Sequence, residues 1–252
     1  MTPRTPLVVG NWKMHKTVAE TRAFFAALRE RPLPLDDVDA VVCPPFTALF
    51  AAREELRGSR IGLGAQNVGW ADRGAFTGEI SPVMLAELGV TWVVVGHSER
   101  RALFGELDER VNEKVRAALA HGITPIVAVG ETADEHAAGR ARDKVCEQVA
   151  AAFAGIAPAD AARCVVAYEP IWAIGTGHAD TPESANDVMG AIRGAAPGLA
   201  DVRVLYGGSV KPENLAAFVA QPNIDGGLVG GASLEPASFA ALLEAARREV
   251  PA

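Results

Sequence analysis

The chain has 252 residues, of which 49% are hydrophobic and 22% charged, and this is an ordinary composition for a globular protein. Its formal net charge of −7 argues against a nucleic acid or an anionic membrane as partner. No apolar stretch approaches the roughly 20 residues of a membrane-spanning helix. The length allows one large α/β domain or two small ones, and an α/β barrel typically has about 250 residues.

The cysteines and the first residues predict the compartment. Cys43, Cys146 and Cys164 form no C-x-x-C pair and cannot all pair with one another, which is typical of a reducing environment. The apolar run 7–9 is too short for the core of a secretory signal peptide. We therefore expect a cytoplasmic protein.

Eight short, almost continuously apolar runs predict strands, at residues 7–10, 40–43, 61–65, 92–96, 123–129, 164–168, 202–206 and 227–230. Strands that are buried on both faces of a parallel sheet have this pattern. Segments with helical spacing lie between the runs. Strand and helix alternating eight times, without a linker or a low-complexity tract, predict a single α/β domain over residues 1–252.

Helix signals support this alternation. Thr17 and Glu20 form a capping box, and Val18, Phe25 and Leu28 lie broadly on one face of the helix that follows. Further helices are expected to begin at Ser81-Pro82, at Asp108, at Thr181-Pro182 and near Pro236.

A closed barrel and an open doubly wound sheet are the two architectures that fit this order. Eight units in this length favour a (β/α)8 barrel of eight parallel strands ringed by helices, and no glycine-rich dinucleotide turn follows the first run. In such a barrel the functional residues lie at the carboxyl ends of the strands.

Glu169 ends the sixth run, and Pro170 stiffens the chain after it. The loop that follows is apolar and carries Trp172, Gly175 and Gly177. A carboxylate on a rigid strand end beside such a loop is typical of a catalytic acid under a lid. The alternative is an acid that caps the strand end and a loop that packs permanently.

Asn11 and Lys13 follow the first run, and the strand period of two places both on one face with Trp12 on the other. A lysine directed into the barrel mouth is unfavourable unless it meets an anion. The alternative is a lysine that reaches outward to a surface acid.

His97 ends the fourth run and shares a face with Val93 and Val95, so we expect it to point inward. Ser98 and Glu99 resemble the start of a short helix, whose N-terminus disfavours the protonated imidazole. A neutral His97 could donate a hydrogen bond to a carbonyl. The alternative is a histidine satisfied within the core.

Paired glycines end the seventh and eighth runs, Gly207-Gly208 before Ser209 and Gly230-Gly231 before Ala232. Such pairs let backbone N–H groups approach an anion closely, although tight turns also use them. The loops after strands seven and eight are the usual phosphate site of such barrels. Two pairs that face a lysine favour phosphate binding.

The remaining histidines give no metal site. His15, His136 and His178 lack the spacing of metal ligands, and His121 is expected on the surface near a helix end. Neither an H-E-x-x-H motif nor a nucleotide phosphate loop occurs.

Five segments together carry a family resemblance: Asn11-Trp12-Lys13, Gly96-His97-Ser98-Glu99-Arg100, Tyr168 through Gly177, Tyr206-Gly207-Gly208-Ser209-Val210 and Gly230-Gly231-Ala232-Ser233. In these segments and their order, from the first strand to the last helix, the chain resembles the triosephosphate isomerases. The segment 168–177 is close to diagnostic of that family. The resemblance implies that Glu169 and His97 are the glutamate base and the neutral histidine known in that family.

The resemblance implies a TIM barrel that interconverts dihydroxyacetone phosphate and glyceraldehyde 3-phosphate through an enediol, in glycolysis and gluconeogenesis, without a cofactor. Glu169 would move the proton between the two carbons, and His97 would donate to the carbonyl oxygens. Lys13 would offset negative charge, and Asn11 would add a polar contact. Glu99 would pair with Lys13 or form a hydrogen bond nearby in the site, and a purely structural ion pair is the alternative.

The resemblance also implies how phosphate binds. The phosphate would rest on backbone N–H groups of Gly175, Ser209, Gly230 and Gly231. Closure of a lid, residues 170–180, would bring Gly175 onto the phosphate, exclude water and suppress loss of phosphate from the intermediate.

The segment 66–81 predicts a partner subunit. It is long for a strand-to-helix loop, where about 2–6 residues is normal, and it carries Trp70, Phe76 and Thr77. In the family a similar loop inserts into a second subunit, where Thr77 would approach Asn11 and Lys13 of the partner subunit. We therefore predict a homodimer. An ordered surface loop is the alternative, and it would leave two aromatic side chains in water.

The sequence departs from the family at three places. The far end of the lid reads His178-Ala179-Asp180, where many relatives have a lysine and smaller or hydroxylic residues, so lid motion is expected to differ. Ala128 and Met14 stand where cysteines are common, which alters local packing and removes redox sensitivity. No catalytic residue is missing.

Two other functions compete with this interpretation. Another phosphate-binding barrel isomerase would need different acids at the strand ends, and a non-catalytic barrel binding protein would lack Glu169 or His97, which are both present.

Overall fold

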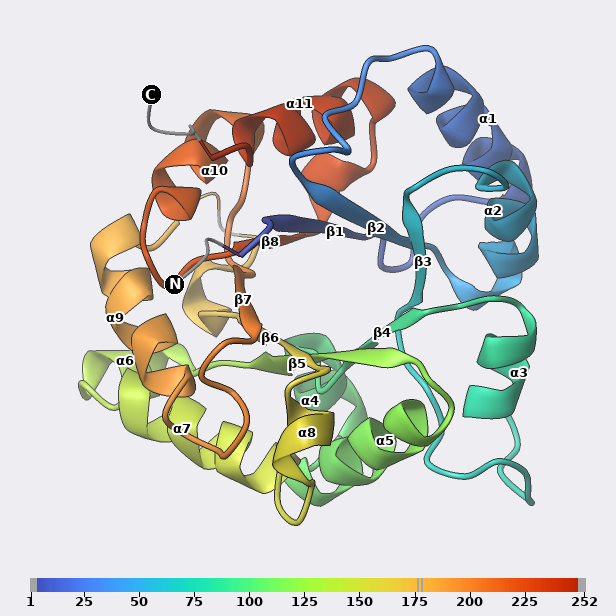
Figure 1. Ribbon diagram of the computed structural model, residues 1–252. Coiled ribbons are helices and arrows are strands. Elements are labelled where there is room, and N and C mark those ends of the chain that lie inside the picture. Colours follow the sequence, from blue (N-terminus) through green and yellow to red (C-terminus); the bar gives the residue numbers. More distant parts are fainter. Residues whose placement is uncertain (1–3, 176, 178, 249–252) are drawn as a thin grey trace.

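The computed structural model describes residues 4–175, 177 and 179–248, and its strands close into one parallel barrel in chain order (Figure 1). β1 pairs with both β2 and β8, so the doubly wound alternative is wrong. The strands are β1 Leu7–Asn11, β2 Asp39–Cys43, β3 Gly62–Ala65, β4 Trp92–Val95, β5 Thr124–Val129, β6 Val165–Tyr168, β7 Arg203–Tyr206 and β8 Gly226–Val229.

All eight strand predictions are confirmed, with ends that differ by one residue at most. The strands are buried along most of their length, as the continuous apolar runs required. A residue at a strand end is the hardest to assign, because it has only some of the ladder hydrogen bonds of the interior.

Helices surround the barrel, namely α1 Val18–Arg29, α2 Leu49–Glu55, α3 Pro82–Glu87, α4 Ser98–Phe104, α5 Asp108–Ala120, α6 Ala133–Ala137, α7 Ala141–Ala152, α8 Pro158–Ala161, α9 Pro182–Ile192, α10 Pro212–Val219 and α11 Pro236–Ala245. Short 3-10 turns occur at η1 Phe46–Ala48, η2 Ile171–Ala173 and η3 Gly231–Ser233. No helix of the described chain is both long and apolar enough to cross a membrane.

The predicted helix starts are confirmed, because α1, α3, α5, α9 and α11 begin at or next to the expected residues. Thr17 and Glu20 form the capping box of α1, and the side chains of Ser81 and Thr181 accept backbone N–H groups at the starts of α3 and α9. The Val18 side chain is 44% exposed, whereas Phe25 and Leu28 are buried. At about 100° per residue the buried face of α1 centres on Thr21 and Leu28, and Val18 lies at its edge.

Two apolar layers hold the barrel. The inner layer fills the barrel with alternate strand residues, Leu7, Val9, Val41, Cys43, Val94, Ile126, Val165, Ala167, Leu205 and Leu228. The outer layer lies between strands and helices, where Trp12 packs edge-on against Phe24. Because side chains fill its interior, the barrel can hold a ligand only at its ends.

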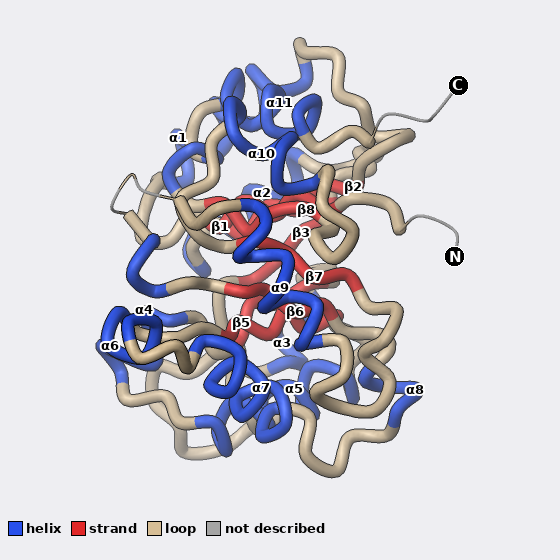
Figure 2. Tube along the Cα trace, turned by 90° about the vertical axis from the view of Figure 1, so that its left-hand side faces the viewer, coloured by secondary structure: helices blue, strands red, loops and turns tan. Residues whose placement is uncertain are grey.

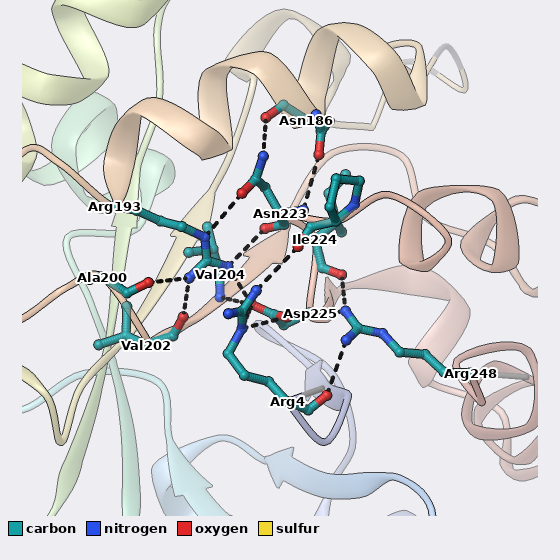
Figure 3. A network of polar contacts seen from close by, with 11 residues as sticks. Arg4, Asn186, Arg193, Ala200, Val202, Val204, Asn223, Ile224, Asp225 and Arg248 are labelled. Carbon is teal, nitrogen blue, oxygen red and sulfur yellow. Dashed lines mark hydrogen bonds and ion pairs between the residues drawn. The ribbon is translucent and has the colours of Figure 1, made fainter. Parts of the chain in front are cut away.

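The two ends of the barrel differ in character. Seen from the side, α4 and α6 lie at one end, and they follow the carboxyl ends of β4 and β5 (Figure 2). At the opposite end, the fully buried carboxylate of Asp225 binds three arginines (Figure 3). Its oxygens lie 2.9 Å from Arg4 Nε, 2.7 Å from Arg193 Nη2 and 3.1 Å from Arg248 Nη2. This network joins the two ends of the described chain.

Candidate active site

A cavity of about 310 Å³ opens at the carboxyl ends of the strands. It is lined by all of the residues predicted to catalyse or to bind substrate, Asn11, Lys13, His97, Glu169, Gly175, Ser209, Gly230 and Gly231. These residues lie at the end of β1 or after β1, β4, β6, β7 and β8, so only closure of the barrel brings them to one place.

Glu169 and His97 form a buried pair in this cavity. The Nε2 atom of His97 lies 3.1 Å from Oε1 of Glu169, and the backbone N–H of Ser98 donates to Oε2 of Glu169 at 3.1 Å. The Glu169 side chain is 3% exposed and the His97 side chain 7%. Burial opposes the charge of Glu169, but His97 and the Ser98 N–H outweigh burial and lower the pKa of Glu169.

The other ring nitrogen of His97 faces the start of α4. The backbone N–H of Glu99 donates to Nδ1 at 3.1 Å, which leaves the proton of the neutral ring on Nε2, facing Glu169. Burial disfavours the imidazolium, but the Glu169 charge outweighs burial and raises the pKa of His97. The sequence predicted that the helix N-terminus would lower the pKa of His97. That direction is wrong while the Glu169 carboxylate is in contact with the ring.

His97 points into the cavity, as predicted, but for a different reason. Val93 and Val95 belong to the outer apolar layer, whereas Val94 lies in the inner one. Simple alternation would therefore turn His97 outward. Gly96 interrupts the alternation with a φ of 71°, a left-handed conformation that favours glycine, and so redirects the chain.

Lys13 meets an anion within the site. Its Nζ donates to Oε1 of Glu99 at 2.6 Å, which is one of the two arrangements expected for Glu99. Lys13 has a φ of 51°, unusual for a residue other than glycine, and its backbone N–H donates to Asn11 Oδ1 at 3.2 Å. Trp12 is fully buried on the other side of the strand, as the period of two predicted.

Glycine and serine make up much of the cavity lining after β7 and β8. Ser209 Oγ donates to the carbonyl of Ala173 at 2.7 Å and so ties the lid to the loop after β7. Gly175 is exposed at the mouth with a φ of 70°. A Cβ on Gly207 would lie 2.8 Å from Cγ of Glu169, so this glycine makes room for the carboxylate.

Sequence reasoning missed a second cluster beneath the lid. The carboxylate of Glu131, which follows β5, is fully buried, and its Oε1 accepts from Tyr168 Oη at 3.1 Å and from Trp172 Nε1 at 2.7 Å. Burial and the neighbouring Glu131 raise the pKa of Tyr168. A carboxylate directly after a predicted barrel strand was the available signal. The cavity lining also includes Lys211 and Leu228, which were not predicted.

The far end of the lid is partly described, since Thr176 and His178 lie outside the described residues. Asp180 is buried and accepts from the backbone N–H of Thr181 at 2.8 Å and from Ser184 Oγ at 3.1 Å. Its own N–H donates to Tyr206 Oη at 2.9 Å. Asp180 therefore joins the lid to α9 and β7.

The loop 66–81 lies outside the cavity of this single chain. Gln66 Nε2 donates to the carbonyls of Lys13 at 2.8 Å and Cys43 at 2.9 Å, which ties the loop to the site. Trp70 is half-buried, with its ring centroid 4.8 Å from that of Phe76. Phe76 is 41% exposed, and Thr77 is exposed as well.

The chain is similar to known proteins over most of its length. The sequence pattern of the family described as triosephosphate isomerase matches residues 6–246. Among curated relatives, the triosephosphate isomerase of Symbiobacterium thermophilum is 52% identical over 249 residues, covering 96% of this chain and 97% of the relative. The triosephosphate isomerase of Roseiflexus sp. is 54% identical over 242 residues, covering 94% of this chain and 95% of the relative. The triosephosphate isomerase of Chloroflexus aurantiacus is 52% identical over 242 residues, covering 94% of this chain and 97% of the relative. This chain belongs to the triosephosphate isomerase family.

Proposed function

We propose that this chain, as one domain over residues 1–252, interconverts dihydroxyacetone phosphate and glyceraldehyde 3-phosphate through an enediol intermediate. The observation that carries the proposal is the convergence of a buried carboxylate, an imidazole and an ammonium group on one cavity with a glycine-rich wall. Family membership supports the same reaction.

In the proposed reaction Glu169 is the base. Its carboxylate removes a proton from the carbon beside the carbonyl, and it returns that proton to the neighbouring carbon. To reach the substrate it must leave the Ser98 N–H and His97, which now occupy its oxygens. Both groups keep the carboxylate ionised until then.

His97 is the proposed electrophile. A substrate carbonyl oxygen placed against Nε2 would take the position of the Glu169 oxygen and remove the contact that raises the pKa of His97. The Glu99 N–H would still bind Nδ1, so the neutral ring donates from Nε2 and moves protons between the two substrate oxygens. Lys13 stabilises the enediolate charge, with Asn11 as a polar contact, and Glu99 holds Lys13 in place.

The substrate phosphate is proposed to bind backbone N–H groups of Gly175, Ser209, Gly230 and Gly231, which line the same cavity as the base. Gly175 is exposed here, so lid movement would be needed to bring its N–H onto a phosphate. Closure would also exclude water, which protects the intermediate from losing phosphate.

We further propose a cytoplasmic homodimer formed through residues 66–81, with Thr77 near Asn11 and Lys13 of the partner subunit. Exposed apolar side chains support this proposal, since Phe76 is 41% and Met14 95% exposed. The expected result is a dimer in sedimentation at micromolar concentration, and an active monomer there would contradict the proposal.

The reaction is tested by following glyceraldehyde 3-phosphate in a coupled assay with purified protein. We expect turnover in the wild type and its loss in Glu169→Ala. Turnover that survives this substitution would refute the assigned base. Absence of turnover in the wild type would favour another barrel isomerase or a non-catalytic binding protein.

A further inference from the structure

Asn214 holds the loop that follows β7. It is the third residue of α10 and does not itself line the described cavity, whereas residues 207–211 all line it. Its side chain spans part of this loop with two hydrogen bonds. Nδ2 donates to the carbonyl of Ser209 at 2.9 Å, and Oδ1 accepts the backbone N–H of Lys211 at 2.8 Å. A single amide group therefore fixes the loop on both sides of Val210.

Helix capping explains one of these two bonds and not the other. Lys211 is the N-cap residue of α10, and a side chain at the third helical position that accepts the N-cap N–H is half of an ordinary capping box. The Ser209 carbonyl belongs to a residue before the N-cap, so the bond to it fixes the loop rather than the helix end. An amide can donate to one group and accept from the other, whereas a carboxylate can only accept.

The backbone N–H of Ser209 is one of the groups proposed to bind phosphate. Within the described residues this N–H donates to no protein acceptor. On the side of β7 the loop is already held, because Gly207 donates its N–H to the carbonyl of Tyr168 at 2.7 Å. Asn214 holds the loop on the side of α10. A donor that is fixed before the ligand arrives binds it without the cost of ordering the loop.

We propose that Asn214 is a positioning residue for phosphate recognition, which acts by holding Ser209 so that its N–H is in place before the substrate binds. Asn214 acts through the loop backbone and has no part in proton transfer between the substrate carbons. This inference rests on the proposed function, because it assumes that the cavity takes a phosphorylated triose.

The test compares a substrate that carries the phosphate with one that lacks it. The value of kcat/KM is measured for glyceraldehyde 3-phosphate and for D-glyceraldehyde, in the wild type and in Asn214→Ala. The ratio of the two values isolates the phosphate end of the site. A general disturbance of the fold, or of Glu169 and His97, would change both values alike and leave the ratio unmoved.

We expect Asn214→Ala to lower kcat/KM for glyceraldehyde 3-phosphate about 10-fold, the scale of weakening one hydrogen bond to a charged group. The value for D-glyceraldehyde should stay unchanged. An equal fall for both substrates, or no fall for either, would overturn the inference.

A second variant, Asn214→Asp, separates the hold on Ser209 from helix capping. Its carboxylate still accepts the Lys211 N–H but cannot donate to the Ser209 carbonyl, and high ionic strength screens the added charge. We expect the ratio to fall in Asn214→Asp as it does in Asn214→Ala. A ratio at the wild-type value would mean that only the cap of α10 matters, and it would overturn the inference.

Asn112→Ala is the matched control. Asn112 is also half-buried on a helix, and its Nδ2 donates to the backbone carbonyls of Ala152 at 2.7 Å and Ala154 at 3.1 Å, none of which line the cavity. This substitution removes similar bonds elsewhere in the fold, so its ratio should equal that of the wild type.

The wild type separates this inference from the proposed function. Active wild type with an unchanged ratio in Asn214→Ala counts against Asn214 alone. Wild type without turnover counts against the proposed function, and the Kd of 2-phosphoglycolate, measured by calorimetry, then decides on Asn214. A rise of about 10-fold in Asn214→Ala would support the inference, and an unchanged Kd would overturn it.

Discussion

At the scale of single residues, Gly207 limits the space available to the proposed base. A methyl group on Gly207 would lie 2.8 Å from Cγ of Glu169, closer than two non-bonded carbon atoms approach. We predict that Gly207→Ala displaces the carboxylate and lowers kcat by about 10²-fold, the scale expected for about 1 Å of misplacement. The coupled assay measures this, with Gly194→Ala as control, because a Cβ at Gly194 meets only the Ala191 carbonyl at 3.8 Å. An unchanged kcat would show that the space beside Gly207 does not limit the position that Glu169 takes in the reaction.

The pair of Glu169 and His97 predicts a pH dependence of stability. The pKa of Glu169 is lowered, so its contribution to stability is present above the unfolded carboxyl pKa of about 4.3 and is lost as pH falls through the folded value. The pKa of His97 is raised, so its contribution is present below about pH 6.5 and is lost as pH rises through the folded value. The pair therefore stabilises most between about pH 4.5 and 6.5.

The measurement is the Tm of the wild type minus that of Glu169→Gln, at pH 5.5 and at pH 8.5. We expect the larger difference at pH 5.5, because both groups are then charged in the folded protein. The reverse order would mean that the two groups do not pair in solution.

At the scale of elements, Glu106 joins β4, α4 and α5. It lies between the two helices, and its Oε2 accepts from Arg100 Nε at 2.6 Å and from Lys114 Nζ at 2.8 Å. Gly96, directly after β4, donates its N–H to Oε1 at 3.3 Å. Burial opposes the charge of Glu106, but Lys114 and Arg100 outweigh burial and lower its pKa.

Removing this carboxylate should destabilise the protein strongly. In Glu106→Gln the Lys114 ammonium, 2% exposed, keeps its bond to Asn67 but loses its anion. We expect a loss of about 3–5 kcal/mol in the free energy of unfolding, measured with urea. Glu113→Gln breaks an exposed pair with Arg110 and should cost about 1 kcal/mol or less. Equal losses would mean that burial of the Glu106 pair does not matter.

At the scale of the whole molecule, Asp225 acts at the end of the barrel opposite the cavity. Besides the three arginines it accepts the backbone N–H of Val204 at 3.0 Å, so it fixes β7 as well as both ends of the described chain. We predict that Asp225→Asn costs about 3–5 kcal/mol and lowers Tm while kcat stays unchanged. The control is Asp36→Asn, whose carboxylate is 94% exposed beside Arg60 and should matter little. A large fall in kcat at unchanged Tm would contradict a purely structural role.

The predictions from sequence succeeded where the signal lay in neighbouring residues. The box of Thr17 and Glu20 and the proline after Thr181 act within one helical turn, and both caps formed as predicted. His97 shows the limit of that approach. The prediction that the His97 side chain points into the barrel is confirmed, but the alternation of strand residues does not explain it. Gly96 breaks that alternation, and no local sequence pattern reveals its left-handed conformation.

The sequence by itself determined the eight strands, the order of the elements and the residue types at the strand ends, because apolar runs and caps depend on residues close in the chain. Only the tertiary structure decided which groups meet. Ser98 binds Glu169 across 71 residues, Tyr168 binds Glu131 across 37, and Arg4 binds Asp225 across 221. Such contacts form because the barrel closes, and closure depends on the packing of all strands together rather than on any one segment.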